Sequence, residues 1–404
     1  MPANMANTAN TAADPDGRAD LRTLRDVLRP EAELLILLAR PDLGEPVRER
    51  VREVLGKDPI DWGFFLDQAA RQGVLPLVSG NLVRWRLTHG PDGTVLVPYR
   101  WLYADVYHGN RRRNLALFDE FAVVFTALNR AGLDVLVRKG PAITERIYRD
   151  PGLRRMADLD LFMHRSDFPR FGAILEELGY RMGTQSPNGR VVLPFGRSEE
   201  LYWKVSLRNV SLPYLKLAHH DEVESFILSG CFSLFQPMSG IEDDFSGFLA
   251  RSVQAIICGA PIRRLDPVDE VLDLCLQVHV EATLLYYIES HKDLTLRKFL
   301  DVALCVSRLP HDSGSELLRR TQDYGCRDSV YFALHHTATV YPGYVPLTLL
   351  ESARPSDLGY LDEYGAFDGR PARWGMPLLE RLFDAHRDRL VADRSAVPGP
   401  RSSI

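Results

Sequence analysis

The chain has few lysines, few cysteines and no long hydrophobic run. Only six of its 49 basic residues are lysines, and its five cysteines include no Cys-x-x-Cys pair. No window approaches the roughly 20 unbroken apolar residues that a membrane-spanning helix needs. These absences exclude a transmembrane helix, a zinc knuckle and a redox-active cysteine pair. What remains is typical of folded protein: 404 residues, 45% hydrophobic and 25% charged.

The charge and the first residues of the chain indicate the setting in which the protein works. A net charge of -5 offers no general attraction to nucleic acid or anionic lipid, so we expect neither a nucleic-acid partner nor a membrane. Residues 1–20 are rich in Ala, Asn and Thr and lack the apolar core of a signal peptide. This predicts a disordered leader, a cytoplasmic protein and buried, reduced cysteines.

Hydrophobic spacing divides the rest of the chain into three regions. Residues 21–131 and 266–404 carry apolar residues at helical spacing, and Trp62, Trp85 and Trp101 are expected in the core of the first of these. Residues 132–265 are expected to form an α+β region with a mixed sheet. Its expected strands are 133–137, 158–163, 191–195, 201–207 and 210–217, with helices at 142–148 and 166–178. In the last region we expect helices at 268–285, 294–306, 316–324, 329–337 and 376–391.

The most informative chemical pattern is a pair of aspartates two residues apart. Asp158 and Asp160 lie on the expected strand 158–163, and the two-residue period of a strand puts both carboxylates on one face. Carboxylates held in this way repel each other unless a cation lies between them, which is the geometry for Mg²⁺ ions that bridge nucleotide phosphates. Two solvated aspartates near a strand edge would give the same pattern, so the pair alone does not distinguish a metal site from a solvated surface.

The segment before these aspartates favours the phosphate interpretation. A strand ends at Lys139-Gly140 and Pro141 opens a helix, so backbone N–H groups and a helix dipole lie where phosphates would bind. An ordinary strand-to-helix turn explains the glycine and the proline but not the cations nearby. Those cations are Arg138, Lys139, Arg154 and Arg155. A strand, a glycine turn, a helix and a strand with two aspartates is the layout expected for metal-assisted nucleotidyl transfer.

At these residues the sequence resembles the uncharacterised nucleotidyltransferase family of the polymerase-β-like superfamily. The resemblance is carried by LVRKGPAITERIYRDPGLRRMADLDLFM and by FGAILEELGY after it. The family pattern is a strand, Lys-Gly, a short helix ending in Tyr, Gly-x-Arg and Asp-x-Asp-Leu. It falls here on Lys139, Gly140, Tyr148, Gly152, Arg154, Asp158, Asp160 and Leu161. Flanking helical segments are similar as well.

The resemblance implies an α+β fold with a nucleotidyltransferase-type mixed sheet core, flanked by N- and C-terminal helical regions. It implies that Asp158 and Asp160 are catalytic and bind metal, with two Mg²⁺ ions expected. Lys139, Gly140 and Arg154 are then expected to bind the nucleotide. The implied reaction transfers a nucleoside monophosphate from an NTP to a small-molecule, peptide or protein acceptor and releases pyrophosphate.

Two departures from the superfamily pattern support a rival interpretation, a catalytically inactive nucleotidyltransferase-like protein that binds a nucleotide or a partner. Superfamily members commonly carry Ser after the glycine, where this chain has Pro141, and Thr144 lies one helical turn further on. A third carboxylate usually stands on a later central strand, but the strand expected at 211–217 offers Lys216. Acidic residues near that strand are Glu199, Glu200, Asp221, Glu222 and Glu224.

Other polar features have structural explanations beside functional ones. His279, on an apolar helix, is a hydrogen-bonded core histidine or, since the resemblance places a histidine there too, a residue on the substrate side. The run Arg111-Arg112-Arg113 is a solvated helix face or attracts phosphate. The cluster 219–222 has no partner at zinc spacing, so a solvated loop or a helix cap explains it better than a metal site.

Overall fold

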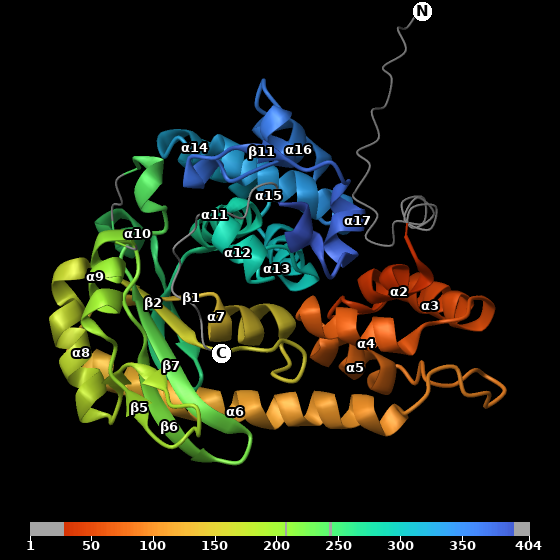
Figure 1. The fold of residues 1–404 in the computed structure, drawn as a ribbon, viewed down its shortest axis with the longest axis horizontal. Coiled ribbons are helices and arrows are strands. Elements are labelled where there is room, and N and C mark those ends of the chain that lie inside the picture. Colours follow the sequence, from red (N-terminus) through yellow and green to blue (C-terminus); the bar gives the residue numbers. More distant parts are fainter. Residues whose placement is uncertain (1–27, 207, 242–244, 392–404) are drawn as a thin grey trace, which may run out of the picture.

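The computed structural model describes residues 28–206, 208–241 and 245–391, and it places a mixed sheet against helices on both faces (Figure 1). Helices come first along the chain, the sheet follows, and helices return, which confirms the predicted α+β fold class with flanking helical regions. The sheet runs from Val135 to Arg264, while the proposed domain limits at 131/132 and 265/266 stay predictions. No described helix combines the length and the apolar character that crossing a membrane requires.

The N-terminal helices begin at prolines and capping side chains. Proline occupies the first turn of α2, α3 and α5, where its missing N–H has no intrahelical partner. Asp61 caps α4 by accepting a hydrogen bond of 3.0 Å from the Phe64 N–H. The four helices are α2 (Pro30–Leu38), α3 (Glu45–Lys57), α4 (Trp62–Arg71) and α5 (Leu75–Arg84).

A single long helix, α6 (Arg100–Arg130), joins this helical region to the sheet. Its buried residues recur every three or four positions, for example Leu117, Phe121 and Phe125. Trp101, predicted in the core, is instead 65% exposed. It lies two residues before the buried Tyr103, which puts it about 200° around the helix and therefore on the solvent side.

The central sheet has seven strands in the order β3-β6-β7-β2-β1-β9-β8. β1 pairs antiparallel with β2 and parallel with β9, and β2 pairs parallel with β7. The strands are β1 (Val135–Arg138), β2 (Leu159–Met163), β3 (Arg181–Met182), β6 (Tyr214–His220), β7 (Val223–Cys231), β8 (Val253–Ile257) and β9 (Ala260–Arg264). Two-stranded ribbons form from β4 (Thr184–Gln185) with β5 (Val192–Leu193), and from β10 (Glu363–Tyr364) with β11 (Ala372–Arg373).

Alternation along the strands decides which face of the sheet the site occupies. Val137 and Leu161 pack into the core shared with α6 and α8 (Phe168–Glu177). Leu136 and Phe162 point the other way, into the core shared with α11 (Pro267–Thr283). Asp160, two residues before Phe162, therefore emerges on the α11 face.

One predicted strand is wrong and another is too long. Of the predicted strand 201–207, residues 201–206 belong to helix α9 (Arg197–Ser206) and residue 207 lies outside the described residues. The predicted strand 191–195 shortens to the two residues of β5. Glu199 accepts a hydrogen bond of 2.8 Å from the Gly196 N–H and so stabilises the first turn of α9. The prediction also overlooked β7 and the β8–β9 hairpin, which complete the sheet.

The C-terminal region is helical, and α11 and α13 start at side-chain caps. Asp266 caps α11 through the Asp269 N–H at 2.7 Å, and Thr295 caps α13 through the Lys298 N–H at 3.4 Å. The remaining helices are α10 (Phe245–Arg251), α12 (Leu285–Glu289), α13 (Leu296–Val306), α14 (Ser313–Asp323), α15 (Arg327–Val340), α16 (Leu347–Ala353) and α17 (Leu378–Phe383). Short 3-10 turns lie at Arg165–Asp167, Pro237–Ser239, Gly359–Asp362, Ala366–Asp368 and Arg387–Leu390.

The helix predicted over 376–391 is mostly wrong, since α17 stops at Phe383. The Asp384 carboxylate accepts a hydrogen bond of 2.8 Å from the His386 N–H, a local turn that competes with helix continuation. The prediction of buried, unpaired thiols is confirmed, because all five cysteines are free and buried.

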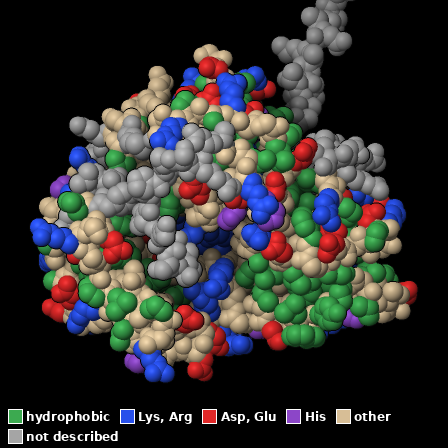
Figure 2. All heavy atoms as spheres, viewed as in Figure 1, with side chains coloured by type: hydrophobic (Ala, Val, Ile, Leu, Met, Phe, Trp, Pro, Cys, Tyr) green, Lys and Arg blue, Asp and Glu red, His purple; other side chains and the backbone are tan. Residues whose placement is uncertain are grey.

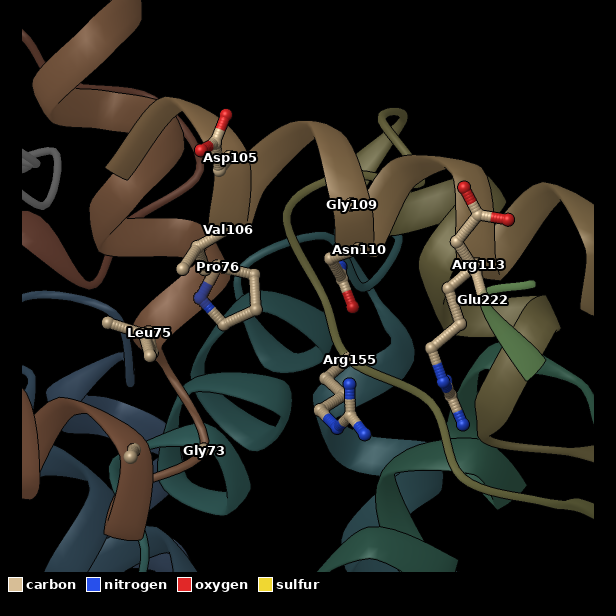
Figure 3. Close-up of a pocket in the computed structure, with 11 residues that line it drawn as sticks. Gly73, Leu75, Pro76, Asp105, Val106, Gly109, Asn110, Arg113, Arg155 and Glu222 are labelled. Carbon is tan, nitrogen blue, oxygen red and sulfur yellow. The ribbon is translucent and has the colours of Figure 1, made fainter. Parts of the chain in front are cut away.

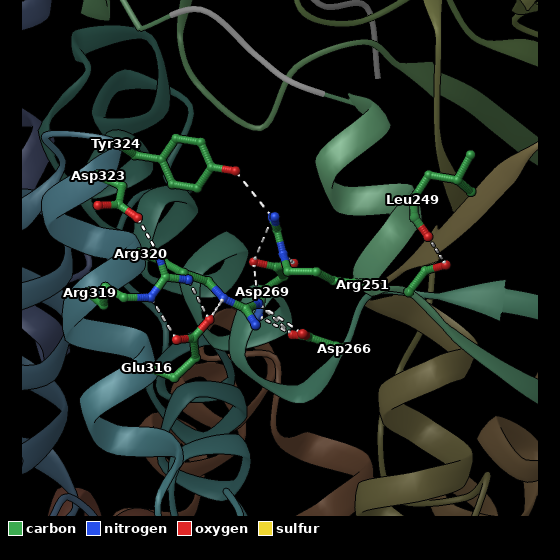
Figure 4. A network of polar contacts seen from close by, with 10 residues as sticks. Leu249, Arg251, Asp266, Asp269, Glu316, Arg319, Arg320, Asp323 and Tyr324 are labelled. Carbon is green, nitrogen blue, oxygen red and sulfur yellow. Dashed lines mark hydrogen bonds and ion pairs between the residues drawn. The ribbon is translucent and has the colours of Figure 1, made fainter.

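An ionic network attaches the C-terminal helices to the sheet region (Figure 4). Arg320 on α14 contacts Asp266 at 2.8 Å and Asp269 at 2.7 Å at the start of α11. Arg251, at the end of α10, reaches the same Asp269 at 2.9 Å. Asp269 is fully buried, so the two arginines compensate a charge that would otherwise be costly to bury.

Candidate active site

The Lys139-Gly140 turn lies directly beside the aspartate pair. Lys139 has φ +47° and ψ −128°, and Gly140 has φ +30°, both in the positive range that L side chains rarely adopt. A Cβ on Gly140 would lie 3.6 Å from the Asp158 carbonyl oxygen, so the turn lies against the backbone of Asp158. Pro141 opens α7 (Gly140–Ile143), which a π-helical turn, Thr144–Tyr148, continues.

The Asp158 and Asp160 side chains form a like-charged pair at the start of the central strand β2. Asp158 immediately precedes β2, and Asp160 is the register partner of Arg138 on β1. Asp158 reaches solvent, yet protein surrounds its carboxyl group, and this burial together with the charge of Asp160 raises the pKa of Asp158 to about 6. Arg297 and Lys139 act against that shift.

The pair fits a Mg²⁺ ion that arrives with its substrate. Mg²⁺ commonly takes one or two carboxylates and completes its coordination with water and substrate phosphates. A cation would also relieve the repulsion that raises the Asp158 pKa. In the described part of the chain no group of three or more His, Cys, Asp or Glu side chains could hold a metal, so the protein alone offers two acids rather than a closed cage.

The position of the usual third carboxylate is filled by uncharged residues. On β7, which neighbours β2, Ser229 lies opposite Asp160, and Ile227 is the next residue on that face. Lys216, expected near this position, points to the other face of the sheet and pairs with Glu120 of α6 at 2.8 Å. Of the acids near the expected strand, Glu222 pairs with Arg112 at 2.6 Å at the β6–β7 turn.

Lys139 approaches the site with part of its charge already compensated. Its Nζ lies 3.8 Å from Oδ1 of Asp273 on α11, and Arg138 also pairs with Asp273. Burial alone would raise the pKa of Asp273, but Arg138 and Lys139 outweigh that effect and hold it below its ordinary value. The buried Asp273 thus positions the strand end from which Lys139 extends.

Arg154 lies away from solvent in a buried ion pair. Its Nη2 is 2.8 Å from Oδ2 of Asp301 on α13, and the Tyr148 hydroxyl donates to Oδ1 of the same carboxylate at 2.8 Å. The structure therefore brings together two motif residues, Tyr148 and Arg154, through an acid about 150 residues downstream. The prediction that Arg154 binds the nucleotide stays a prediction, and the visible role of this side chain is to hold the loop before β2.

Two asparagines of α6 hold the same loop from its other side. Asn110 donates from Nδ2 to the Gly152 carbonyl at 2.9 Å, and Asn114 donates to the carbonyls of Pro151 and Arg154 at 2.6 and 2.7 Å. Sequence reasoning missed both residues. Their four-residue spacing, which puts two amides on one helix face, was the only available signal.

Thr144 does not replace the missing serine hydroxyl. Its Oγ1 donates to the Gly140 carbonyl at 2.9 Å, and the side chain is fully buried. Phosphates would therefore meet backbone and cations at this turn rather than a hydroxyl.

Three arginines lie around the approach to Asp158. Arg155 was expected there and Arg113 belongs to the run for which phosphate attraction was one alternative, whereas Arg297 was not predicted. Arg155 comes from the loop before β2, Arg113 from α6 and Arg297 from α13. Arg113 lies close to Arg155 and Asp158, because the charges of both act on its pKa. The space-filling view shows a hollow at the centre of this face in which Lys and Arg side chains gather (Figure 2). The Arg111-Arg112-Arg113 run thus divides, with Arg112 paired to Glu222 and Arg113 turned to the site.

For His279, the structure favours the interpretation as a hydrogen-bonded core histidine. His279 is mostly buried between α11 and α15, and its Nδ1 lies 2.8 Å from the Ser329 hydroxyl. Burial lowers the pKa of His279 to about 4, so the ring is neutral at physiological pH.

A comparison with protein families matches this chain over most of its length. A family described as uncharacterised nucleotidyltransferase matches residues 58–342, which include the Lys139-Gly140 turn, the aspartate pair and Asp301. Neither the curated proteins nor the solved structures give a significant match. The family description supports nucleotidyl transfer in general, with an NTP as substrate.

Proposed function

The chain belongs to the uncharacterised nucleotidyltransferase family, and from that premise we propose that it is a Mg²⁺-dependent nucleotidyltransferase. It would transfer a nucleoside monophosphate from an NTP to a small-molecule, peptide or protein acceptor in the cytoplasm. The observation that carries the proposal is the position of the Gly140 turn against the backbone of Asp158, the first residue of the aspartate pair. This arrangement would bring the backbone proposed to bind phosphates and the two carboxylates proposed to bind metal into one small site.

In the proposed reaction, a nucleophilic oxygen or nitrogen of the acceptor forms a bond to the α-phosphorus of the NTP. The bond from that phosphorus to the bridging oxygen breaks, pyrophosphate leaves with the electron pair, and the proton of the acceptor passes to solvent. Bound at Asp158 and Asp160, Mg²⁺ would supply neutralisation of phosphate charge.

The chain's own groups contribute binding and orientation. Lys139 and the Gly140 backbone are proposed to face the phosphates, and Arg297 adds positive charge at the same approach. Arg154 and Asp301 keep the loop before β2 in place, so that Asp158 stays beside the turn. Holding both reactants in line removes much of the entropic cost of a bimolecular reaction.

A second candidate, a protein that binds NTP without turnover, is favoured by two observations. Ser229 and Ile227 stand where a third acid would assist the acceptor, and the Thr144 hydroxyl is engaged by the Gly140 carbonyl. Both proposals require Mg²⁺-dependent nucleotide binding, and they differ only in the release of pyrophosphate.

The first test measures binding of non-hydrolysable α,β-methylene analogues of the four NTPs to the full chain, with Mg²⁺ or with EDTA. We expect Mg²⁺-dependent binding that Asp160→Asn weakens at least tenfold, because one of two metal ligands loses its charge. Asp134→Asn, an exposed aspartate just before β1, is the matched control and should bind as the unaltered chain does.

A second assay decides between the two candidates. Pyrophosphate release from NTPs with Mg²⁺ and the small-molecule fraction of a cell extract supports the transferase. Binding without release supports the inactive protein. Equal nucleotide affinity in Mg²⁺ and in EDTA would contradict both.

A further inference from the structure

A cavity of about 500 Å³ lies over the N-terminal half of α6, between that helix, the start of α5 and the loop before β2 (Figure 3). Cavities of this size accommodate small organic molecules. Part of the wall is apolar and is supplied by Leu75, Pro76 and Val106. The family match, the turn at Gly140 and the aspartate pair leave this cavity without a role.

The cavity adjoins the aspartate pair. Arg113 and Arg155 line it, and Asp158 is near enough to Arg113 to act on its pKa. The Arg297 side chain packs against Gly73, another lining residue, since a Cβ there would lie 3.1 Å from the arginine Nε. Arg155 lies three residues before Asp158 in the same loop, so a molecule in the cavity would bind beside the loop that carries Asp158.

Two acids, Asp105 and Glu222, line the cavity together with Arg113 and Arg155. Glu222 already pairs with Arg112 at 2.6 Å, so the end formed by Arg113 and Arg155 is suited to an anion. Within the described residues, Arg155 is exposed and makes neither an ion pair nor a hydrogen bond, and Arg113 donates only to the Met156 carbonyl. Burial and the neighbouring charge of Arg155 lower the pKa of Arg113 to about 10, while the charge of Asp158 acts in the opposite direction. Two such groups side by side bind carboxylate or phosphate oxygens well.

A buried amide adds a second requirement. Asn110 is 5% exposed, and its Nδ2 is fixed by the carbonyls of Pro151 and Gly152, so its Oδ1 cannot be turned toward them. That Oδ1 is buried without a partner, and Figure 3 shows it on the side that faces Arg155. Buried acceptors are nearly always paired, so a ligand here should bring a hydrogen-bond donor.

We propose that this cavity is the acceptor site and that the acceptor is a small organic anion. It would carry a carboxylate or phosphate for Arg113 and Arg155, a hydroxyl or amine for Asn110, and an apolar body for Leu75 and Val106. The inference rests on the proposed nucleotidyltransferase function and names its substrate class. The nucleotide is assigned to the Lys139-Gly140 turn, so the two substrates would meet at Asp158.

A glycine on α6 allows the cavity to be filled without disturbing the fold. Gly109 lines the cavity, and a Cβ added there meets no atom within 4 Å, so Gly109→Leu should occupy the space. Gly56, inside α3, also has no atom within 4 Å of an added Cβ, which makes Gly56→Leu the matched control. Both changes replace a helical glycine, so both variants should melt no lower than the unaltered chain.

The experiment uses three probes and calorimetric titration of the full chain. The probe 4-hydroxyphenylacetate has the anion, the ring and the donor. Phenylacetate lacks the donor, and tyramine replaces the anion with a cation. We expect 4-hydroxyphenylacetate to bind, phenylacetate to bind at least threefold more weakly and tyramine not to bind. Gly109→Leu and Arg155→Gln should each weaken the first probe at least tenfold, and Gly56→Leu should leave it unchanged.

Nucleotide binding, measured on the same variants, separates this proposal from the one on which it rests. Gly109→Leu should bind Mg²⁺ and α,β-methylene NTP as the unaltered chain does. Loss of nucleotide binding in that variant would assign the cavity to the nucleotide base, and binding of tyramine or of none of the probes would equally overturn the acceptor proposal. If Asp158→Asn kept Mg²⁺-dependent nucleotide binding while the anion probe still bound, only the proposed metal site would fail.

Discussion

At the scale of single residues, the site concentrates backbone strain where chemistry is proposed. Among the described residues, Lys139 is one of six non-glycine residues with positive φ, and its combination of φ +47° and ψ −128° suits glycine. Positions of this kind cost about 1–3 kcal/mol each and persist where the surroundings over-determine them. Here the buried Asp273 and the start of α7 hold the turn.

Substitution of the strained Lys139 should affect the stability of the fold and the affinity for nucleotide in different ways. Lys139→Gly removes the strain and the cation together, so the free energy of unfolding should stay equal or rise by about 1 kcal/mol. Its affinity for Mg²⁺-NTP analogues should fall at least tenfold. Denaturant titration and nucleotide titration measure the two effects.

The matched control is Arg149→Gly. Arg149 also has positive φ, at +60°. It lies just after the π-helical turn and is exposed. This variant should gain similar stability and keep its nucleotide affinity. Unchanged affinity in Lys139→Gly would remove Lys139 from the proposed phosphate site.

At the scale of elements, helices far apart in sequence position the site through buried ions. Asp273 of α11 holds the end of β1, and Asp301 of α13 holds the loop before β2. The position of α11 depends in turn on Arg320 of α14, which pairs with Asp266 and Asp269 at its N-terminus. A displacement of α11 would therefore move Asp273, and with it the end of β1 that lies beside the aspartate pair.

The link between α14 and α11 predicts unequal effects of two adjacent substitutions. Arg320→Met should lower the free energy of unfolding by about 3 kcal/mol, because it leaves the buried Asp269 with one arginine instead of two. Arg319→Met removes a cation that is 58% exposed and should change stability by no more than about 0.5 kcal/mol. Urea denaturation compares the two, and equal losses would show that the network does not stabilise the fold.

At the scale of the whole molecule, the C-terminal helices bury neutral histidines. Burial lowers the pKa of His336 to about 3 and that of His279 to about 4. His336 sits on α15 with Nε2 3.3 Å from the Leu361 carbonyl oxygen, and His335 and Arg381 also disfavour its protonation. An unfolded histidine takes up its proton near pH 6.5.

The sign of the resulting pH dependence follows directly. Below pH 6.5 the unfolded chain binds protons that the folded chain does not, so these histidines destabilise the fold as the pH falls toward their folded pKa values. Between pH 7 and pH 5 His336 should contribute a loss of about 2 kcal/mol. The variant His336→Gln should lose about 2 kcal/mol less than the unaltered chain over that interval, as measured by denaturant titration at each pH. Identical losses would mean that His336 is protonated in the folded state.

The sequence by itself determined the features that depend on local order along the chain. The period of Val135–Arg138 and the Asp-x-Asp spacing fix which side chains share a face, and Lys139-Gly140-Pro141 fixes a turn between a strand and a helix. These short-range rules predicted the sheet core, the flanking helices and the aspartate pair. They failed for 201–206, where alternation and helical spacing coincide and the cap at Glu199 decides for a helix.

Only the tertiary structure decided what each charged residue faces. The pairing of β2 with β7 places Ser229 beside Asp160, and no local pattern reveals which strands become neighbours. Arg154 meets Asp301 and Lys139 meets Asp273 because separate helices pack on the site, whereas no acid within the described ranges pairs with Arg155. Electrostatics depends on distance in space, which a sequence fixes only through the complete fold.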